Sequence, residues 1–357
     1  MLKNIIAIIF TLFFSLTAQA KQYDQIIFFG DSLTDNGNMY NLLLKILPKS
    51  PPYFNGRFSN GYTWAEHIGK YYQEKQAINY KIYAYGGATA VFHWPTDQFV
   101  DLTTLELEID LFLVQSFFEN KDKNLYAIWI GGNDYMYGQS ENPDKLTDNV
   151  VEKINWAMNT LRYYGAKDFL ILNLPDLAMT PQGQNQGSIE KLHQLTVMHN
   201  QKLAAAIQHF KNSNPGTHIT TVDIYDLFNH FMTSPGDYNE KYHVNITNTR
   251  QSCWEGGYLL KQYMLEENIM SDLRQSMLNE KDFSKKDQKI QAMSHFIVKT
   301  PVLTQTYLLG KSYANGNVPC ANPSEYLFWD FIHPTQTTHW VLSQVVLEQL
   351  TNAGARS

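Results

Sequence analysis

The sequence contains a serine and an Asp-x-x-His group that could together carry out acyl transfer. Ser32 lies just after the short apolar run Gln25–Phe29, and Asp330 precedes His333 by three residues near the other end of the chain. Acyl transfer by serine needs a base to accept the hydroxyl proton and a carboxylate to orient that base. These residues are therefore candidates for such a site. Taken separately, an N-capping serine and a structural Asp–His pair would look the same.

Two glycine-containing turns between these blocks could supply hydrogen-bond donors to an oxyanion. Gly86 and Gly87 follow one apolar run, and residues 131–133 (GGN) follow another. Glycine lets backbone N–H groups approach a ligand closely, and the Asn133 side-chain amide adds a further donor. With the Ser32 N–H they could form an oxyanion hole, in which one donor is worth about 3–4 kcal/mol. Each turn alone could equally be an ordinary tight turn.

The elements that must position these residues alternate between strand and helix. Short apolar runs predict strands, and longer amphipathic patterns between them predict helices. The strands are expected at residues 25–29, 80–85, 125–130, 168–174 and 218–222, and the helices at 105–118, 150–161, 188–211 and 335–350. This alternation predicts an α/β fold, with a parallel sheet covered on both faces and ligand chemistry at the carboxyl ends of its strands.

The first 20 residues have the pattern of a secretory signal peptide. Lys3 precedes the apolar run Ile5–Leu16, and residues 18–20 (AQA) match a cleavage site. The run is shorter than the ~20 apolar residues of a membrane-spanning helix, which disfavours the alternative of a retained anchor. We expect a signal peptide over 1–20, one domain over 21–357, and a secreted protein.

Export would make a disulfide the expected state of the two cysteines, Cys253 and Cys320, although two separate thiols are the alternative. Both lie in a segment of about residues 236–323 in which we predict no strand. The stretch 266–289 is dense in charged side chains, so we expect a solvent-exposed insertion rather than core. Such an insertion is either a lid or inhibitory loop released by an activating protease, or a passive surface excursion.

The composition narrows the class of protein. A net charge of −6 with 44% hydrophobic residues excludes a disordered chain, and no Lys/Arg block points to nucleic acid as a partner. No HExxH, paired Cys/His, GxGxxG or Walker spacing is present, so neither a metal nor a cofactor is predicted. His193 and His199 are expected to be ordinary helix residues. Asn245 begins a glycosylation sequon.

The four blocks, in this order, resemble the GDSL or SGNH-hydrolase family of serine esterases and lipases. The resemblance runs from Ile26 to about Leu350, with a gap over the insertion. It implies a three-layer α/β/α flavodoxin-like sandwich, in agreement with the alternation of strands and helices.

The resemblance also implies a role for each residue of the candidate site. Ser32 would be the nucleophile, His333 the base and Asp330 its orienting carboxylate. Gly87, chosen over its neighbour in the alignment, and Asn133 would join the Ser32 N–H in the oxyanion hole.

A finer likeness rests on residues 30–38 (GDSLTDNGN) and on 55–61 (NGRFSNG), which Trp64 follows. These stretches resemble the bacterial branch of secreted phospholipases, lysophospholipases, glycerophospholipid–cholesterol acyltransferases and thermolabile haemolysins. The loop 55–61 could bind an acyl ester or brace the helix that starts near Trp64.

The resemblance implies an enzyme that hydrolyses acyl esters of (lyso)phospholipids at membrane surfaces through an acyl-serine. Transfer of the acyl group to an alcohol such as a sterol is a second outcome of the same chemistry. The alternatives are an acetylesterase acting on carbohydrates or small esters, and a non-catalytic secreted protein that binds lipid.

Overall fold

The computed structural model describes residues 23–91, 103–138, 142–185, 189–256, 266–278 and 287–354. The predicted signal peptide over 1–20 lies outside these ranges. None of the helices in the described part of the chain combines the length and the apolar character needed to cross a bilayer.

Five short strands form one parallel sheet, as the alternation predicts. The strands are β1 (Gln25–Gly30), β2 (Asn79–Ile82), β3 (Asn124–Trp129), β4 (Asp168–Leu172) and β5 (His218–Val222). Their order is β2-β1-β3-β4-β5 and all neighbours are parallel. This is the flavodoxin-like order, in which the strand sequence reverses beside β1.

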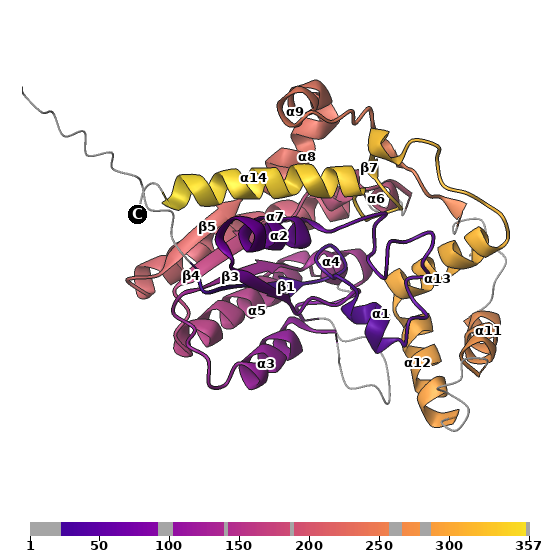
Figure 1. Ribbon diagram of the computed structural model, residues 1–357, viewed down its shortest axis with the longest axis horizontal. Helices are drawn as coiled ribbons and strands as arrows, with labels where there is room; N and C mark the ends of the chain where they lie inside the picture. Colours follow the sequence, from indigo (N-terminus) through magenta and orange to yellow (C-terminus); the bar gives the residue numbers. More distant parts are fainter. Residues whose placement is uncertain are drawn as a thin grey trace, which may run out of the picture.

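Helices cover both faces of the sheet, which makes the fold a three-layer α/β/α sandwich (Figure 1). On one face lie α2 (Trp64–Gln76) and α14 (Gln336–Gly354); on the other lie α3 (Leu105–Gln115), α5 (Pro143–Tyr163) and α7 (Ile189–Ser213). Successive residues of a strand point to opposite faces. Accordingly, Phe28 packs on Trp64 of α2, with ring centroids 5.5 Å apart, and Phe29 packs on Phe112 of α3 at 5.8 Å.

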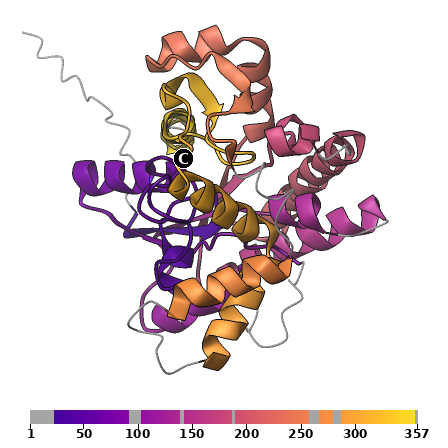
Figure 2. The ribbon, with the colours of Figure 1, turned by 90° about the vertical axis from the view of Figure 1, so that its right-hand side faces the viewer.

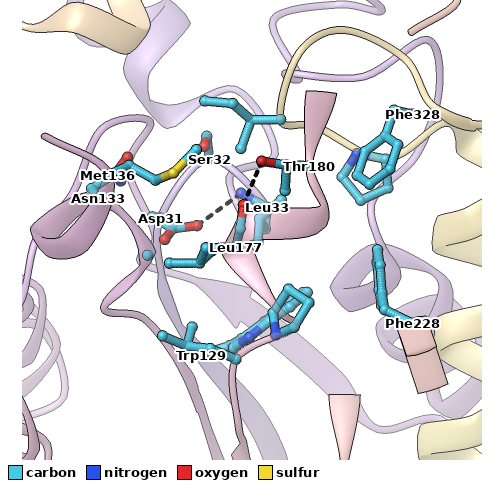
Figure 3. Close-up of a pocket in the computed structure, with 15 residues that line it drawn as sticks. Asp31, Ser32, Leu33, Trp129, Asn133, Met136, Leu177, Thr180, Phe228 and Phe328 are labelled. Atoms are coloured by element: carbon cyan, nitrogen blue, oxygen red, sulfur yellow. Dashed lines mark hydrogen bonds between the residues drawn. The ribbon is translucent and has the colours of Figure 1, made fainter. Parts of the chain in front are cut away.

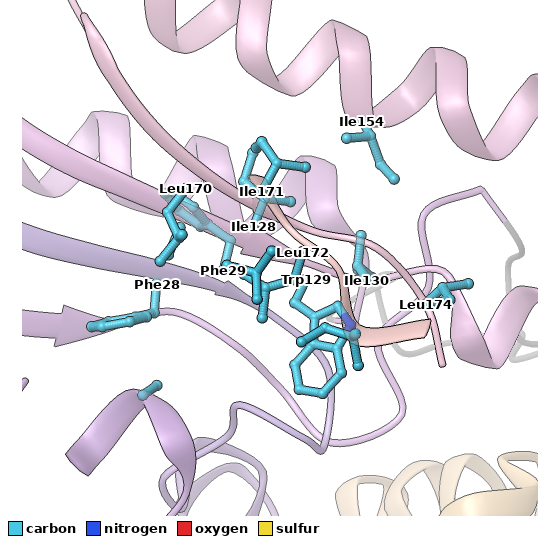
Figure 4. Packing of buried hydrophobic residues seen from close by; sticks show 14 of the residues in the cluster. Phe28, Phe29, Ile128, Trp129, Ile130, Ile154, Leu170, Ile171, Leu172 and Leu174 are labelled. Atoms are coloured by element: carbon cyan, nitrogen blue, oxygen red, sulfur yellow. The ribbon is translucent and has the colours of Figure 1, made fainter. Parts of the chain in front are cut away.

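The same division is visible inside the core, where most side chains are fully buried. Figure 4 shows Ile154 of α5 pointing from its helix toward the sheet, whereas Phe28 points away to the opposite face. The core therefore consists of two apolar layers separated by the strands. These layers hold the strands, and with them the carboxyl edge of the sheet, in place.

Shorter elements complete the sandwich and lead into the insertion. Around the sheet lie α1 (Asn38–Leu42), α4 (Gly132–Tyr137), the 3-10 turn η1 (Leu177–Met179), α6 (Pro181–Asn185), α8 (Ile224–Thr233) and α9 (Pro235–Tyr242). The later chain forms β6 (Asn248–Ser252), α11 (Glu266–Leu278), α12 (Asp287–Lys299), α13 (Pro301–Ala314), the 3-10 turn η2 (Pro323–Glu325) and β7 (Tyr326–Phe328). Figure 1 shows α11, α12 and α13 together at one end of the molecule, and Figure 2 views that end.

The structure corrects two expectations about the insertion. First, it contains a strand: β6 pairs in parallel with β7, which precedes the Asp-x-x-His block. The sequence of β6 is polar (NTRQS), so no apolar run marks it.

Second, the charge-rich stretch is not merely solvent-exposed, because its helix α11 has a buried face. Ile269, Leu273 and Met277 recur every four residues and are almost fully buried, with α12 and α13, in a second apolar cluster. The composition of the stretch does not indicate this apolar stripe, because charged residues lie between its members.

The predicted disulfide between Cys253 and Cys320 is confirmed, with Cα atoms 4.9 Å apart. It joins the end of β6 to the segment that precedes η2. The insertion is therefore tied covalently beside the strand that leads to the Asp-x-x-His block.

Candidate active site

The candidate residues converge at the carboxyl edge of the sheet, where β1 and β3 are neighbours. Ser32 follows β1, from which the chain continues to α2 on one face. Asn133 follows β3, from which the chain continues to α5 on the other face. Adjacent strands whose connections leave to opposite faces open a crevice between them, which is where α/β folds bind ligands.

Ser32, His333 and Asp330 form a continuous hydrogen-bonded array. His333 Nε2 lies 2.8 Å from Ser32 Oγ, and His333 Nδ1 lies 2.8 Å from each carboxylate oxygen of Asp330. The three residues are 6%, 1% and 3% exposed, respectively. A base within hydrogen-bond reach of a hydroxyl, and itself oriented by a carboxylate, is the arrangement that activates a serine nucleophile.

The loop between β7 and α14 explains why the Asp-x-x-His spacing works. Asp330 Oδ1 accepts the backbone N–H groups of Ile332 and His333, at 3.0 and 2.9 Å. The Trp329 N–H donates to the His333 carbonyl at 2.7 Å and closes the loop. The Asp330 side chain thus stabilises the turn that follows it, and this turn places the His333 imidazole next to the Asp330 carboxylate.

Asp330 stays ionised although it is buried. Burial would raise the pKa of its carboxyl group, but the neighbouring His333 and the backbone N–H donors outweigh burial and hold the pKa below its ordinary value. A carboxylate next to an imidazole is the partner that orients the base in a Ser–His–Asp arrangement.

Asn133 is held at the start of α4 by a turn that needs glycine. Gly131 precedes the helix with φ +115°, a conformation that residues with a Cβ rarely adopt. The Asn133 side chain is 7% exposed, and its amide donates to the Ala88 carbonyl at 2.7 Å. An asparagine amide carries two N–H donors, so this contact fixes the group while using only one of them.

The second glycine turn distinguishes Gly87 from Gly86. The Gly86 N–H donates to the buried carboxylate of Asp35 at 2.7 Å and is therefore directed into the protein. Gly87 has φ +80°, and a Cβ there would lie 3.1 Å from methyl groups of Thr300 and Val302 in the insertion. Both backbone and space restrict this position to glycine, and the insertion reaches the candidate oxyanion turn.

An apolar crevice begins at Ser32 (Figure 3). Its walls include Trp129, Met136, Leu177, Phe228 and Phe328. In the figure, Ser32, Asn133 and Met136 stand at one side, and Phe228 and Phe328 at the other. The crevice offers apolar contacts next to the Ser32 hydroxyl.

Buried carboxyl groups surround the turn that carries Ser32, and none of the sequence motifs predicts them. Burial raises the pKa of Asp31 to about 7 and that of Asp35 to about 6. Glu108 of α3 accepts the Gly30 N–H at 2.8 Å, and burial raises its pKa well above the ordinary value. One signal was present: Glu108 lies on the apolar face of its helix, between Leu105 and Phe112 in the 3.6-residue pattern.

The loop 55–61 braces the neighbouring helix, one of its two predicted roles. Arg57 donates to both carboxylate oxygens of Glu66, at 3.1 and 2.5 Å, and Glu66 forms the capping box of α2 with Thr63. The loop also reaches the candidate site, because the Phe58 ring lies 5.3 Å from the His333 ring.

The two histidines of α7 have different surroundings. His193 lies 2.6 Å from Asp176 Oδ2 with its side chain half exposed. His199 is fully buried, and its Nδ1 lies 2.7 Å from the Tyr135 hydroxyl of α4. Burial lowers the pKa of His199 to about 3, so it is neutral and serves to fasten α4, which carries Asn133, to α7.

A parallel α/β sandwich with a Ser–His–Asp array at its carboxyl edge is the architecture of a serine hydrolase. The chain belongs to the GDSL-like lipase/acylhydrolase family, whose model matches residues 26–346.

Several known proteins are similar to this chain. A phosphatidylcholine-sterol acyltransferase of Aeromonas hydrophila is 29% identical over 339 residues, which cover 92% of each chain. The thermolabile hemolysin of Vibrio parahaemolyticus is 25% identical over 94% of this chain and 65% of its own. The secreted effector protein SseJ of Salmonella typhimurium is 28% identical over 58% of this chain and 48% of its own. Among solved structures, a lipolytic G-D-S-L family protein from Veillonella parvula has a TM-score of 0.36 at 17% identity, covering 59% of this chain and 83% of its own.

Proposed function

We propose that this protein is a secreted serine esterase that hydrolyses the acyl esters of phospholipids and lysophospholipids. The observation that carries the proposal is the Ser32–His333–Asp330 array, whose Ser32 lines an apolar crevice. The similarity to a phosphatidylcholine-sterol acyltransferase over 92% of each chain supports a lipid ester as substrate. The mostly apolar walls suit an acyl group bound next to Ser32.

The geometry supports a two-step reaction through an acyl-serine. His333 Nε2 accepts the Ser32 proton as Oγ attacks the ester carbonyl, and Asp330 stabilises the resulting imidazolium. The oxyanion would be stabilised by the N–H groups of Ser32 and Gly87 and by the Asn133 amide. His333 then protonates the leaving alcohol, and the acyl group stays on Ser32.

The second step decides between hydrolase and acyltransferase. His333 removes a proton from the acceptor, which attacks the acyl-serine and restores the free hydroxyl. Water gives a fatty acid, whereas an alcohol such as a sterol gives a new ester. We propose that both acceptors are used, since one acyl-enzyme serves both.

Secretion and control by the insertion belong to the same proposal. The N-terminal pattern and the disulfide support export, and the insertion packs on Gly87 through Thr300 and Val302. Cleavage by an activating protease between Cys253 and Cys320 would then change activity. Limited proteolysis with parallel assays tests this, and unchanged activity after clean cleavage would remove the regulatory role.

Product analysis of the purified wild type and Ser32→Ala tests the reaction itself. Substrates are lysophospholipid, diacylphospholipid and an acetylated sugar, each with and without a sterol. We expect fatty acid release from the lipids, at least a thousandfold lower in Ser32→Ala, and labelling of wild type alone by a fluorophosphonate. Activity only on the acetylated sugar would favour the acetylesterase, and an unlabelled, inactive wild type would favour a lipid-binding protein.

A further inference from the structure

Tyr53 contacts the carboxylate of Asp330, and the mechanism above gives it no role. Its hydroxyl donates to Asp330 Oδ2 at 2.7 Å, and the residue is 2% exposed. Oδ1 accepts two backbone N–H groups of its own loop. Among the residues that the structure describes, Tyr53 is the donor that Oδ2 has besides His333.

Aromatic neighbours hold the Tyr53 ring in place. The ring packs edge-on against Phe58 and Trp329, with centroids 6.5 and 6.4 Å away. Leu309 of α13 and Cys253 belong to the same buried cluster. A ring enclosed from several chain segments keeps its hydroxyl aimed at one carboxylate oxygen.

We propose that Tyr53 is a positioning residue, whose hydroxyl orients Asp330 and limits how strongly that carboxylate attracts a proton on His333. The inference rests on the proposed acyl-transfer function. Burial raises the pKa of Tyr53 well above its ordinary value, so the group is a neutral donor at every working pH.

Removal of the hydroxyl has a predictable consequence for the array. A hydrogen bond to a carboxylate disperses its negative charge, and a buried carboxylate oxygen without a donor is costly. In Tyr53→Phe, more of the Asp330 charge acts on His333, which favours the imidazolium, while the carboxylate is less firmly oriented. We expect kcat to fall about tenfold. KM should be unchanged, since Tyr53 does not line the crevice.

Tyr126→Phe is a matched control because it removes the hydroxyl of an equally buried tyrosine far from the array. The Tyr126 hydroxyl donates to the Lys121 carbonyl at 3.0 Å, at the amino end of β3. Both variants should lose stability. In Tyr53→Phe, the acidic limb of the kcat/KM profile should also move to higher pH, and in Tyr126→Phe it should not.

A proton-NMR titration of the His333 ring gives a readout that does not depend on activity. The signal is assigned by its loss in His333→Asn. Its midpoint should move to higher pH in Tyr53→Phe and stay in place in Tyr126→Phe. Leu309→Ala serves as a second comparator, because it loosens the same cluster and leaves the hydroxyl in place.

An unchanged midpoint in folded Tyr53→Phe would overturn the proposal, as would an equal shift in Leu309→Ala. The effect of Tyr53→Phe on rate should also largely vanish in an Asp330→Asn background. An undiminished effect there would mean that Tyr53 acts through another group. If Ser32→Ala kept full activity, the proposed function would fall, and the titration would still decide the role of Tyr53.

Discussion

At the residue scale, backbone groups hold two residues of the candidate site, Asn133 and Asp330, in place. The amide of Asn133 is held by the Ala88 carbonyl, and Asp330 is held by the backbone of its own loop. Such preorganisation matters because a donor that is already in place needs no reorganisation when negative charge develops. Loss of a single hydrogen-bond donor at the candidate site should therefore lower kcat strongly.

Asn133→Ala should lower kcat by about a hundredfold to a thousandfold with little change in KM, the size of effect found for a lost oxyanion donor. Steady-state kinetics on a soluble ester measure this change. Asn159→Ala, an exposed asparagine of α5, is the control and should leave both constants unchanged. A large rise in KM with an unaltered kcat would mean that Asn133 binds the ground state instead.

At the element scale, two helices on the same face of the sheet hold the turns that carry Ser32 and Asn133. The turn after β1 is held from α3 by Glu108, and the turn after β3 is held from α7 by His199. Each contact joins a helix of the outer layer to the carboxyl edge of the sheet. The outer layer thus does more than cover apolar surface, because it also determines where the reacting groups lie.

Glu108 makes the stability of this arrangement depend on pH. Its pKa is raised in the folded state, so the folded protein retains a proton that the unfolded chain loses above pH about 4.5. The stabilisation is complete below that pH and is lost as pH rises toward the folded-state pKa. The loss is at most about 1.4 kcal/mol per pH unit.

Glu108→Gln should flatten this loss, because an amide oxygen can still accept the Gly30 N–H and does not titrate. Urea unfolding at pH 5, 6, 7 and 8 should show a smaller decline in the free energy of unfolding than wild type. Glu106→Gln, on the exposed side of the same helix, should leave the decline unchanged. Equal slopes in wild type and Glu108→Gln would show that Glu108 is ionised in the folded protein.

At the scale of the whole molecule, sequence periodicity was sufficient to predict the α/β/α sandwich but not the structure of the insertion. The apolar runs of the central strands β1, β3 and β4 identified them because buried parallel strands are largely apolar. The edge strands β2 and β5 are partly exposed and were located by their place in the alternation with helices. Polar β6 and charge-rich α11 gave no such signal, since one is a short strand with an exposed face and the other buries a narrow stripe.

The residues of the candidate site also fall into those that the sequence predicts and those that it does not. Ser32 and His333 were recognisable from the order of four motifs, although the spacing of residues 301 positions apart carries no geometric information. Tyr53 and Glu108 act through contacts across 277 and 78 positions, and only the folded chain reveals them.

The insertion and the Asp-x-x-His loop form one backbone-bonded unit. The Cys253 N–H donates to the Phe328 carbonyl at 3.0 Å, and the Trp254 N–H donates to the Trp329 carbonyl at 2.7 Å. The disulfide to Cys320 holds this strand end in place. Since the residue after Trp329 is Asp330, whose carboxylate contacts His333, the disulfide should support both the stability of the molecule and the array.

Cys253→Ser/Cys320→Ser should therefore lower the free energy of unfolding by about 2–4 kcal/mol, because the bridge no longer restricts the unfolded chain. It should also lower kcat, because the strand end that pairs with the loop of Asp330 is less firmly held. Denaturant unfolding and ester hydrolysis measure the two effects. A reducing agent should reproduce both in wild type and change neither in the double variant. A double variant with lower stability and full kcat would show that the disulfide stabilises the protein but does not help to hold the array.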